Sequence, residues 1–130
     1  MGLSDAQVRA TIAVTDISRA TEFYEGALGL APLGGEGMES VRMYRCGEGS
    51  LLQVYVSQHA GNTTSTVASW SAADFESVVE ELAARGVTFE TYGEPETSDE
   101  GVHTFGEHKV VWFKDPDGNT IAVDNGGIPG

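Results

Sequence analysis

The sequence predicts a single domain over residues 1–130, with an α+β fold of two tandem βαβββ modules at about residues 7–58 and 65–125. Three observations predict this fold. They are a repeated hairpin pattern, a repeated helical pattern, and an apolar share of 40% that suits a folded chain of this length. We interpret the two modules as a duplication.

The clearest repeat is a β-hairpin pattern at the end of each module. In the second module, the β-branched and aromatic runs at residues 110–113 and 120–123 flank the turn Asp-Pro-Asp-Gly-Asn. The proline of this turn fixes its own φ, and Gly118 tolerates a positive φ, so the turn closes a hairpin. Residues 41–54 repeat the pattern without a gap, and Gly49 matches Gly118 at a spacing of 69 residues.

A helical pattern precedes each hairpin. Apolar residues recur at helical spacing over residues 16–28 and 74–85. Each segment starts with an aspartate that can cap the first turn, and Gly29 and Gly86 suit the left-handed position after the last turn. The helices lie 58 residues apart and the hairpins 69, so we expect an insertion of about eleven residues in the second module, at residues 93–101.

The remaining segments complete the two modules. Residues 58–64 are polar and form the predicted linker. Side chains of a strand alternate between two faces, so the apolar alternate positions are expected under the helices and the others on the open face. The other strands, including those of the first hairpin, are predicted at residues 8–14, 31–33, 39–46, 50–57, 65–71 and 87–92.

The composition excludes several classes of function. The net charge is −13, and residues 66–130 contain thirteen acids and three bases, a charge of −10, whereas phosphate binding needs the opposite sign. We therefore expect no nucleic-acid partner. The acidic surface favours solubility and attracts cationic ligands. Cys46 is the single cysteine, which excludes a disulfide within the chain and a thiolate metal cluster.

The location of the protein is predicted from the same features. No segment has the pattern of a secretory leader, and no apolar stretch approaches the length that spans a membrane. A lone cysteine fits a reducing compartment. We expect a cytoplasmic protein with no membrane partner.

Three motifs occur in order along the chain: Val14-x-Asp16, Ala20-x-x-Phe23-Tyr24-x-x-x-Leu28-Gly29-Leu30 and Asp115-Pro116-Asp117-Gly118-Asn119. Together they resemble the glyoxalase/bleomycin-resistance/extradiol-dioxygenase (vicinal oxygen chelate) superfamily. The resemblance extends from Val8 to Val123, and it implies two curled sheets that form a cup with the helices outside. It also implies a homodimer, in some members with exchanged modules.

The resemblance also implies a divalent metal at the floor of the cup, held by His, Gln or Glu from the first and fourth strands of each module. The matching positions here are Arg9 and Gln53 in the first module and Val67 and Ala122 in the second. A guanidinium and two apolar side chains cannot ligate a metal, and an amide is a weak donor. We therefore expect no metal and no cofactor, as in a metal-free branch that resembles the bleomycin-type resistance proteins.

A displaced metal site at His103, Glu107 and His108 is the alternative, because imidazole is a common metal ligand. The interpretation that we favour is a pair of histidines beside a loop, with solvated rings.

The open face of the strands supplies the candidate ligand-binding residues. An apolar cavity with a few converging polar groups is the usual form of a small-molecule site. Trp70 has the parity of the helix side, so we predict it to be a core residue. The ligand-binding candidates are Trp112, Tyr55, Met43, Gln53, Arg9 and Asp124.

We predict a small-molecule binding protein that sequesters an antibiotic or another planar, cationic ligand. The alternative is a glyoxalase-like isomerase, lyase or dioxygenase that works without a metal, and no spacing in the sequence names its catalytic residues. A third hypothesis is a protein that contacts a basic partner through its acidic face.

Overall fold

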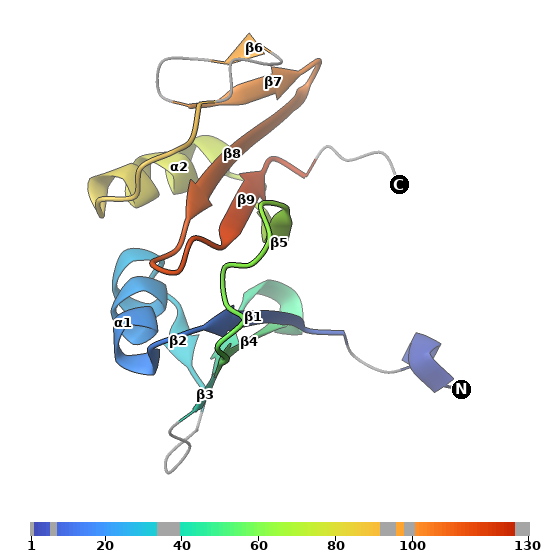
Figure 1. The fold of residues 1–130 in the computed structure, drawn as a ribbon. Helices are drawn as coiled ribbons and strands as arrows, with labels where there is room; N and C mark the ends of the chain where they lie inside the picture. Colours follow the sequence, from blue (N-terminus) through green and yellow to red (C-terminus); the bar gives the residue numbers. More distant parts are fainter. Residues whose placement is uncertain (1, 6–7, 34–39, 92–95, 98–100, 127–130) are drawn as a thin grey trace.

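A computed structural model of the chain describes residues 2–5, 8–33, 40–91, 96–97 and 101–126. Two sheets lie side by side, and both long helical segments lie on the same side of them (Figure 1). One sheet has the strand order β1-β4-β3-β2 and the other β5-β9-β8-β7-β6. The sheets stay separate and do not close into a barrel. The predicted α+β fold of two modules is therefore confirmed.

The first module contains the four-stranded sheet. Its first strand pairs in parallel with its last, so that Thr11 lies opposite Gln53, and the last strand pairs antiparallel with β3. A short 3-10 turn, η1 (Gly2–Asp5), precedes the module. The elements are β1 (Ala10–Val14), α1 (Ile17–Thr21), η2 (Glu22–Ala27), β2 (Ala31–Pro32), β3 (Val41–Arg45), η3 (Gly47–Gly49) and β4 (Leu51–Val56).

The second module repeats this arrangement. Its first strand again pairs in parallel with its last, and the hairpin partner of the last strand is antiparallel. The pairing pattern thus supports a duplication. The elements are β5 (Thr66–Ser71), α2 (Phe75–Ala84), β6 (Glu96–Thr97), β7 (His103–Phe105), β8 (His108–Lys114) and β9 (Thr120–Asp124).

The helix predicted at residues 16–28 changes its winding part-way. Asp16 caps it as predicted and accepts from the amides of Ser18 and Arg19 at 2.9 and 3.3 Å. Only the first turn is α-helical. Residues 22–27 form a π-helix, in which the Leu28 amide donates to the Phe23 carbonyl at 2.9 Å. A π turn is a local widening that no apolar periodicity encodes.

The second helix matches its prediction more closely. It covers Phe75–Ala84, one residue shorter at each end than predicted. Asp74 occupies the N-cap position, but its side chain makes no capping hydrogen bond. Gly29 and Gly86 have φ values of +72° and +93°, which confirms both predicted left-handed positions after the helices.

The strand predicted at residues 87–92 is wrong for the part of it that the structure describes. Phe89 forms an isolated bridge to Phe113, and the Glu90 amide donates to the Trp112 carbonyl at 2.7 Å. The neighbouring position in the sheet is taken by β7, which forms three residue pairs with β8. The insertion predicted at residues 93–101 lies mostly outside the described residues.

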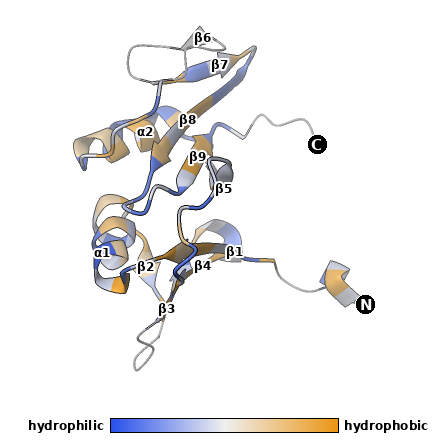
Figure 2. Cartoon of the chain, in the orientation of Figure 1, coloured by the Kyte–Doolittle hydropathy of each residue, from blue (hydrophilic) through white to orange (hydrophobic). Residues whose placement is uncertain are grey.

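The core lies between the sheets and the helices. The alternate apolar positions of the strands face it, as the parity argument predicts, and Figure 2 shows apolar residues along β1, β9 and the helices. None of the helices in the described part of the chain has the length and apolar character needed to cross a membrane. The largest of the fully buried aromatic and aliphatic side chains are Tyr24, Tyr44, Phe75, Phe113, Ile12, Leu52 and Ile121.

The turn between β8 and β9 joins the two modules. The Asp117 carboxylate accepts from the Thr15 hydroxyl at 2.5 Å and from the Arg19 guanidinium at 2.9 Å. The Asn119 amide donates to the Ala13 carbonyl at 2.8 Å. These hydrogen bonds hold together residues that are about a hundred positions apart in the sequence. We call the turn at Asp115–Asn119 the clamp, because it binds the second module to the first.

Candidate functional site

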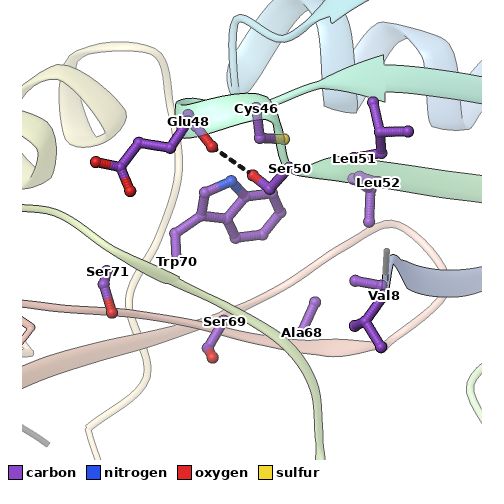
Figure 3. Close-up of a pocket in the computed structure, with 12 residues that line it drawn as sticks. Val8, Cys46, Glu48, Ser50, Leu51, Leu52, Ala68, Ser69, Trp70 and Ser71 are labelled. Atoms are coloured by element: carbon purple, nitrogen blue, oxygen red, sulfur yellow. Dashed lines mark hydrogen bonds between the residues drawn. The ribbon is translucent and has the colours of Figure 1, made fainter. Parts of the chain in front are cut away.

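A cleft of about 510 Å³ lies between the modules, beside the starts of β1 and β4 and the end of β5. The apolar part of its wall from the first module contains Val8, Ala10, Leu51 and Leu52. The indole of Trp70 extends from β5 toward the turn before β4 and forms the opposite wall (Figure 3). The cleft is thus a concave surface with one large aromatic wall.

Trp70 was predicted to be a core residue, and the structure shows a second role. It is half-buried and packs against the core, as predicted. It also lines the cleft and a smaller apolar cavity of about 150 Å³ beneath the helices, beside Leu82 and Phe113. Parity placed the residue on the correct face. The end of β5 lies beside the open cleft, which parity does not encode.

The position of the cleft follows from the duplication. At the 69-residue spacing, the turn of Cys46–Ser50 is the counterpart of the clamp at Asp115–Asn119. The clamp binds the end of β1. Its counterpart faces the end of β5, at Ser69–Ser71, and the cleft lies between these two segments. The cleft therefore lies where a second clamp, from the first module to β5, would be if the repeat were exact.

The residue types explain why this second clamp is missing. In the repeat, Cys46 is the counterpart of Asp115 of the clamp, and it has no carboxylate. Asp115 accepts a hydrogen bond from the Tyr24 hydroxyl of the first helix, whereas the counterpart of Tyr24 in the second helix is Leu82, which has no hydroxyl. Ser50 replaces the clamp asparagine, and its hydroxyl donates to the Gly47 carbonyl of its own turn at 2.7 Å. The first hairpin thus lacks the side chains that hold the second one.

Polar groups surround the mouth of the cleft. Glu48 lies there with a left-handed backbone (φ 55°, ψ 35°), the only positive φ of a non-glycine residue in the described part of the chain. Such a conformation is unfavourable for glutamate and is often found at functional sites. The Ser71 hydroxyl, also in the lining, donates to the buried Asp124 carboxylate at 3.0 Å.

The six predicted ligand-binding residues fall into separate groups, and none of them lines this cleft. Met43 and Gln53 are paired neighbours in the first sheet, and Tyr55 follows on the same face, all half-buried. Arg9 is exposed just before β1. Their contact with a ligand stays a prediction.

The other two candidates belong to the second sheet. Trp112 donates from Nε1 to the Thr66 hydroxyl at 3.2 Å, and its ring meets that of His103 edge-on at 4.8 Å. Asp124 is 3% exposed and accepts from Ser71 and from the Gly126 amide. Asp124 therefore borders the cleft only through Ser71.

The expectation that both histidines of the second module have solvated rings is wrong for His103 and, at Nδ1, for His108. His103 is fully buried, with Nδ1 at 2.9 Å from the Gly101 carbonyl. His108 is half-buried, and its Nδ1 has no hydrogen-bond partner among the described residues. No group of three His, Cys, Asp or Glu side chains that could hold a metal occurs in the described part of the chain, so His103, Glu107 and His108 do not form one.

A family model matches residues 6–123, and its description is the glyoxalase/bleomycin resistance protein/dioxygenase superfamily. The chain belongs to this superfamily. The match includes both modules and the clamp, which agrees with the resemblance drawn from the sequence motifs.

Several solved structures have the same fold as this chain. A glyoxalase/bleomycin resistance protein from Catenulispora acidiphila is 26% identical, with a TM-score of 0.67 over 92% of this chain and 97% of that one. The fosfomycin resistance protein FosX from Mesorhizobium loti is 16% identical (TM-score 0.63, 95% and 94% covered). A putative glyoxalase family protein from Bacillus anthracis is 15% identical (TM-score 0.70, 92% and 93% covered). No curated protein sequence matches the chain.

The metal that the superfamily implies does not fit the residues of this chain. Arg9 supplies a cation, and Val67 and Ala122 supply methyl groups, at three of the positions expected to hold ligands. Ala122 is 5% exposed and pairs with Trp112, so its place is filled by packing. Gln53 alone offers an oxygen there, and one amide does not make a metal site.

Proposed function

We propose that this protein binds a small organic molecule and sequesters it, in the manner of a resistance protein for an antibiotic or another planar, cationic compound. The observation that supports this function best is the cleft with its Trp70 wall. Its volume of about 510 Å³ falls in the usual range for small-molecule sites. An indole offers a large, rigid surface on which a flat ligand can stack.

The donor set favours binding over metal-dependent chemistry. Arg9, Val67 and Ala122 at the expected ligand positions cannot activate a substrate through a metal. Two of the similar structures are described as a bleomycin resistance protein and a fosfomycin resistance protein, so bleomycin, with its flat and cationic parts, is the first compound to test and fosfomycin, a small anion, is its comparison. A homodimer and a cytoplasmic location remain predictions, and sedimentation at micromolar concentration tests the first.

The two tryptophans allow one experiment to test both whether a ligand binds and where it binds. Trp70 lines the cleft, and Trp112 lies in the second sheet opposite the buried Ala122. In Trp112→Phe the only indole is Trp70, and in Trp70→Phe it is Trp112. Both variants are titrated with bleomycin and fosfomycin, and emission and thermal shift are recorded. Binding in the cleft changes the emission of Trp112→Phe and leaves that of Trp70→Phe unchanged.

The opposite pattern would place the ligand on the predicted cup face, beside Trp112. If neither antibiotic, nor any member of a wider panel of glycopeptide and quinone antibiotics, changes emission or melting temperature, the binding function is wrong. Catalytic turnover of a compound, measured by mass spectrometry, would favour the metal-independent enzyme instead.

A further inference from the structure

We propose that the cleft is selective for a hydrophobic amine, a protonated amino group attached to a flat apolar body. This inference rests on the proposed function and names the ligand class for the same protein. It follows from which hydrogen-bonding groups of the cleft are already used. None of the six residues predicted from the sequence lines the cleft, although Asp124 accepts the hydrogen bond that orients the Ser71 hydroxyl.

The two serines with assigned hydrogen bonds offer acceptors to the cleft. The Ser71 hydroxyl donates its proton to Asp124 at 3.0 Å, and the Ser50 hydroxyl donates to the Gly47 carbonyl at 2.7 Å. A hydroxyl has one proton and two lone pairs, so both oxygens retain acceptor capacity. A ligand that donates hydrogen bonds is therefore favoured over one that accepts them.

The charge of the lining also favours a ligand that donates hydrogen bonds, because it favours a cation. Glu48 is the charged residue in it, and the described lining contains no lysine, arginine or histidine. Arg9 lies between two lining residues, Val8 and Ala10, but is not part of the wall. The net charge of −13 adds a long-range attraction for cations, which salt screens.

The apolar walls favour a flat, apolar body for the part of the ligand that carries no charge. Trp70 faces Leu51, Leu52 and Val8 across the cleft, so an aromatic ring can stack on the indole while its edge meets aliphatic groups (Figure 3). An ammonium group near the indole face gains a further cation–π attraction. Carboxylate, serine oxygens and indole thus all favour the same ligand class.

Three matched probes test this inference: biphenylmethylamine, biphenylmethanol and biphenylcarboxylate. They share one apolar body and differ in charge. Binding is measured by calorimetry and by protection of Cys46, which lines the cleft, from alkylation by iodoacetamide. We expect the amine to bind at least about threefold more tightly than the alcohol, the carboxylate to bind most weakly, and the amine to protect Cys46.

Variants separate the local charge from the overall charge. Glu48→Gln should weaken the amine by about two- to fivefold and leave the alcohol unchanged. Glu107→Gln removes the same charge from an exposed residue that is not in the cleft lining, so it should leave both unchanged. Trp70→Phe should weaken all three probes and reduce the protection of Cys46. Thermal melting confirms that each variant is folded.

The outcomes distinguish this inference from the function on which it rests. Equal binding of the three probes, or equal effects of Glu48→Gln and Glu107→Gln, overturns the amine preference and leaves a small-molecule protein. Binding of the amine without protection of Cys46 overturns the location. If the probes fail and an antibiotic binds, the amine class is wrong. If no compound of either series binds, the proposed function itself fails.

Discussion

The Tyr24 hydroxyl donates to the Asp115 carboxylate at 2.8 Å, which connects the first helix to the clamp of the second module. Tyr24 is 0% exposed and Asp115 is 4% exposed. The same carboxylate accepts from the amides of Asp117 and Asn119, both at 2.9 Å. One buried carboxylate thus organises the turn and binds it to the other module.

Removal of this hydroxyl should destabilise the fold. Tyr24→Phe leaves a buried carboxylate oxygen with one donor fewer, and we expect a loss of about 1–3 kcal/mol in the free energy of unfolding. Urea denaturation measures it. The control is Tyr55→Phe, since Tyr55 is half-buried and outside the core, and it should change stability by less than about 0.5 kcal/mol. Equal stability of Tyr24→Phe and the wild type would contradict the importance of the clamp.

Stability should fall at alkaline pH. Burial, together with a hydrogen bond to Glu25, raises the pKa of Tyr44 from 10.0 to about 12. Burial and Asp115 also raise the pKa of Tyr24. Above about pH 10 the unfolded chain loses protons that the folded chain keeps, so stability declines as the pH rises toward 12, by up to about 1.4 kcal/mol per pH unit for each retained proton.

The alkaline effect is checked by urea denaturation at about pH 9 and pH 11. Tyr44→Phe has no proton to lose at this position, so its stability should fall less between the two values than that of the wild type. An identical decline in both proteins would show that Tyr44 is not a source of the effect.

The linker should tolerate no side chain at Gly61. Its φ is +70°, and a Cβ there would collide with the Asp117 carbonyl of the clamp. We expect Gly61→Ala to destabilise the protein by at least about 1–2 kcal/mol. Gly26→Ala is the matched control, because its Cβ would meet no neighbour and alanine favours a helix. If thermal unfolding shows that Gly61→Ala is as stable as the wild type, the predicted collision with the Asp117 carbonyl is wrong.

Binding should depend on Trp70. If a ligand occupies the cleft, Trp70→Ala should weaken binding by about 1–3 kcal/mol, the usual effect of removing an aromatic anchor. The smaller Trp70→Phe change keeps apolar volume and controls for loss of folding. Trp112→Ala should have that effect only if the ligand binds beside Trp112 in the second sheet, so titration of the two variants decides between these places.

Purified, tag-free protein should contain no stoichiometric zinc, manganese, nickel or iron. The reason is the residue types at the expected ligand positions, Arg9, Val67 and Ala122. Elemental analysis measures the content, and a chelator should leave the melting temperature unchanged. One equivalent of any of these metals per chain would contradict the metal-free interpretation.

The sequence by itself determined the local features of this protein. The division into two modules, the left-handed Gly29, Gly86 and Gly118, and the cap at Asp16 depend on residues near one another in the chain, although the second sheet has five strands where the repeat predicts four. Strand parity is equally local, since it follows from alternation alone. These predictions hold because turn chemistry and periodicity act over a few residues.

Only the tertiary structure decided the features that arise from distant contacts. The π turn at residues 22–27, the burial of His103 and the second role of Trp70 could not be predicted, because each depends on what packs against it. The cleft is the clearest case. The sequence contains both hairpin turns, but only in the folded chain does the Asp115 turn bind the first module while the Cys46 turn leaves a space beside β5.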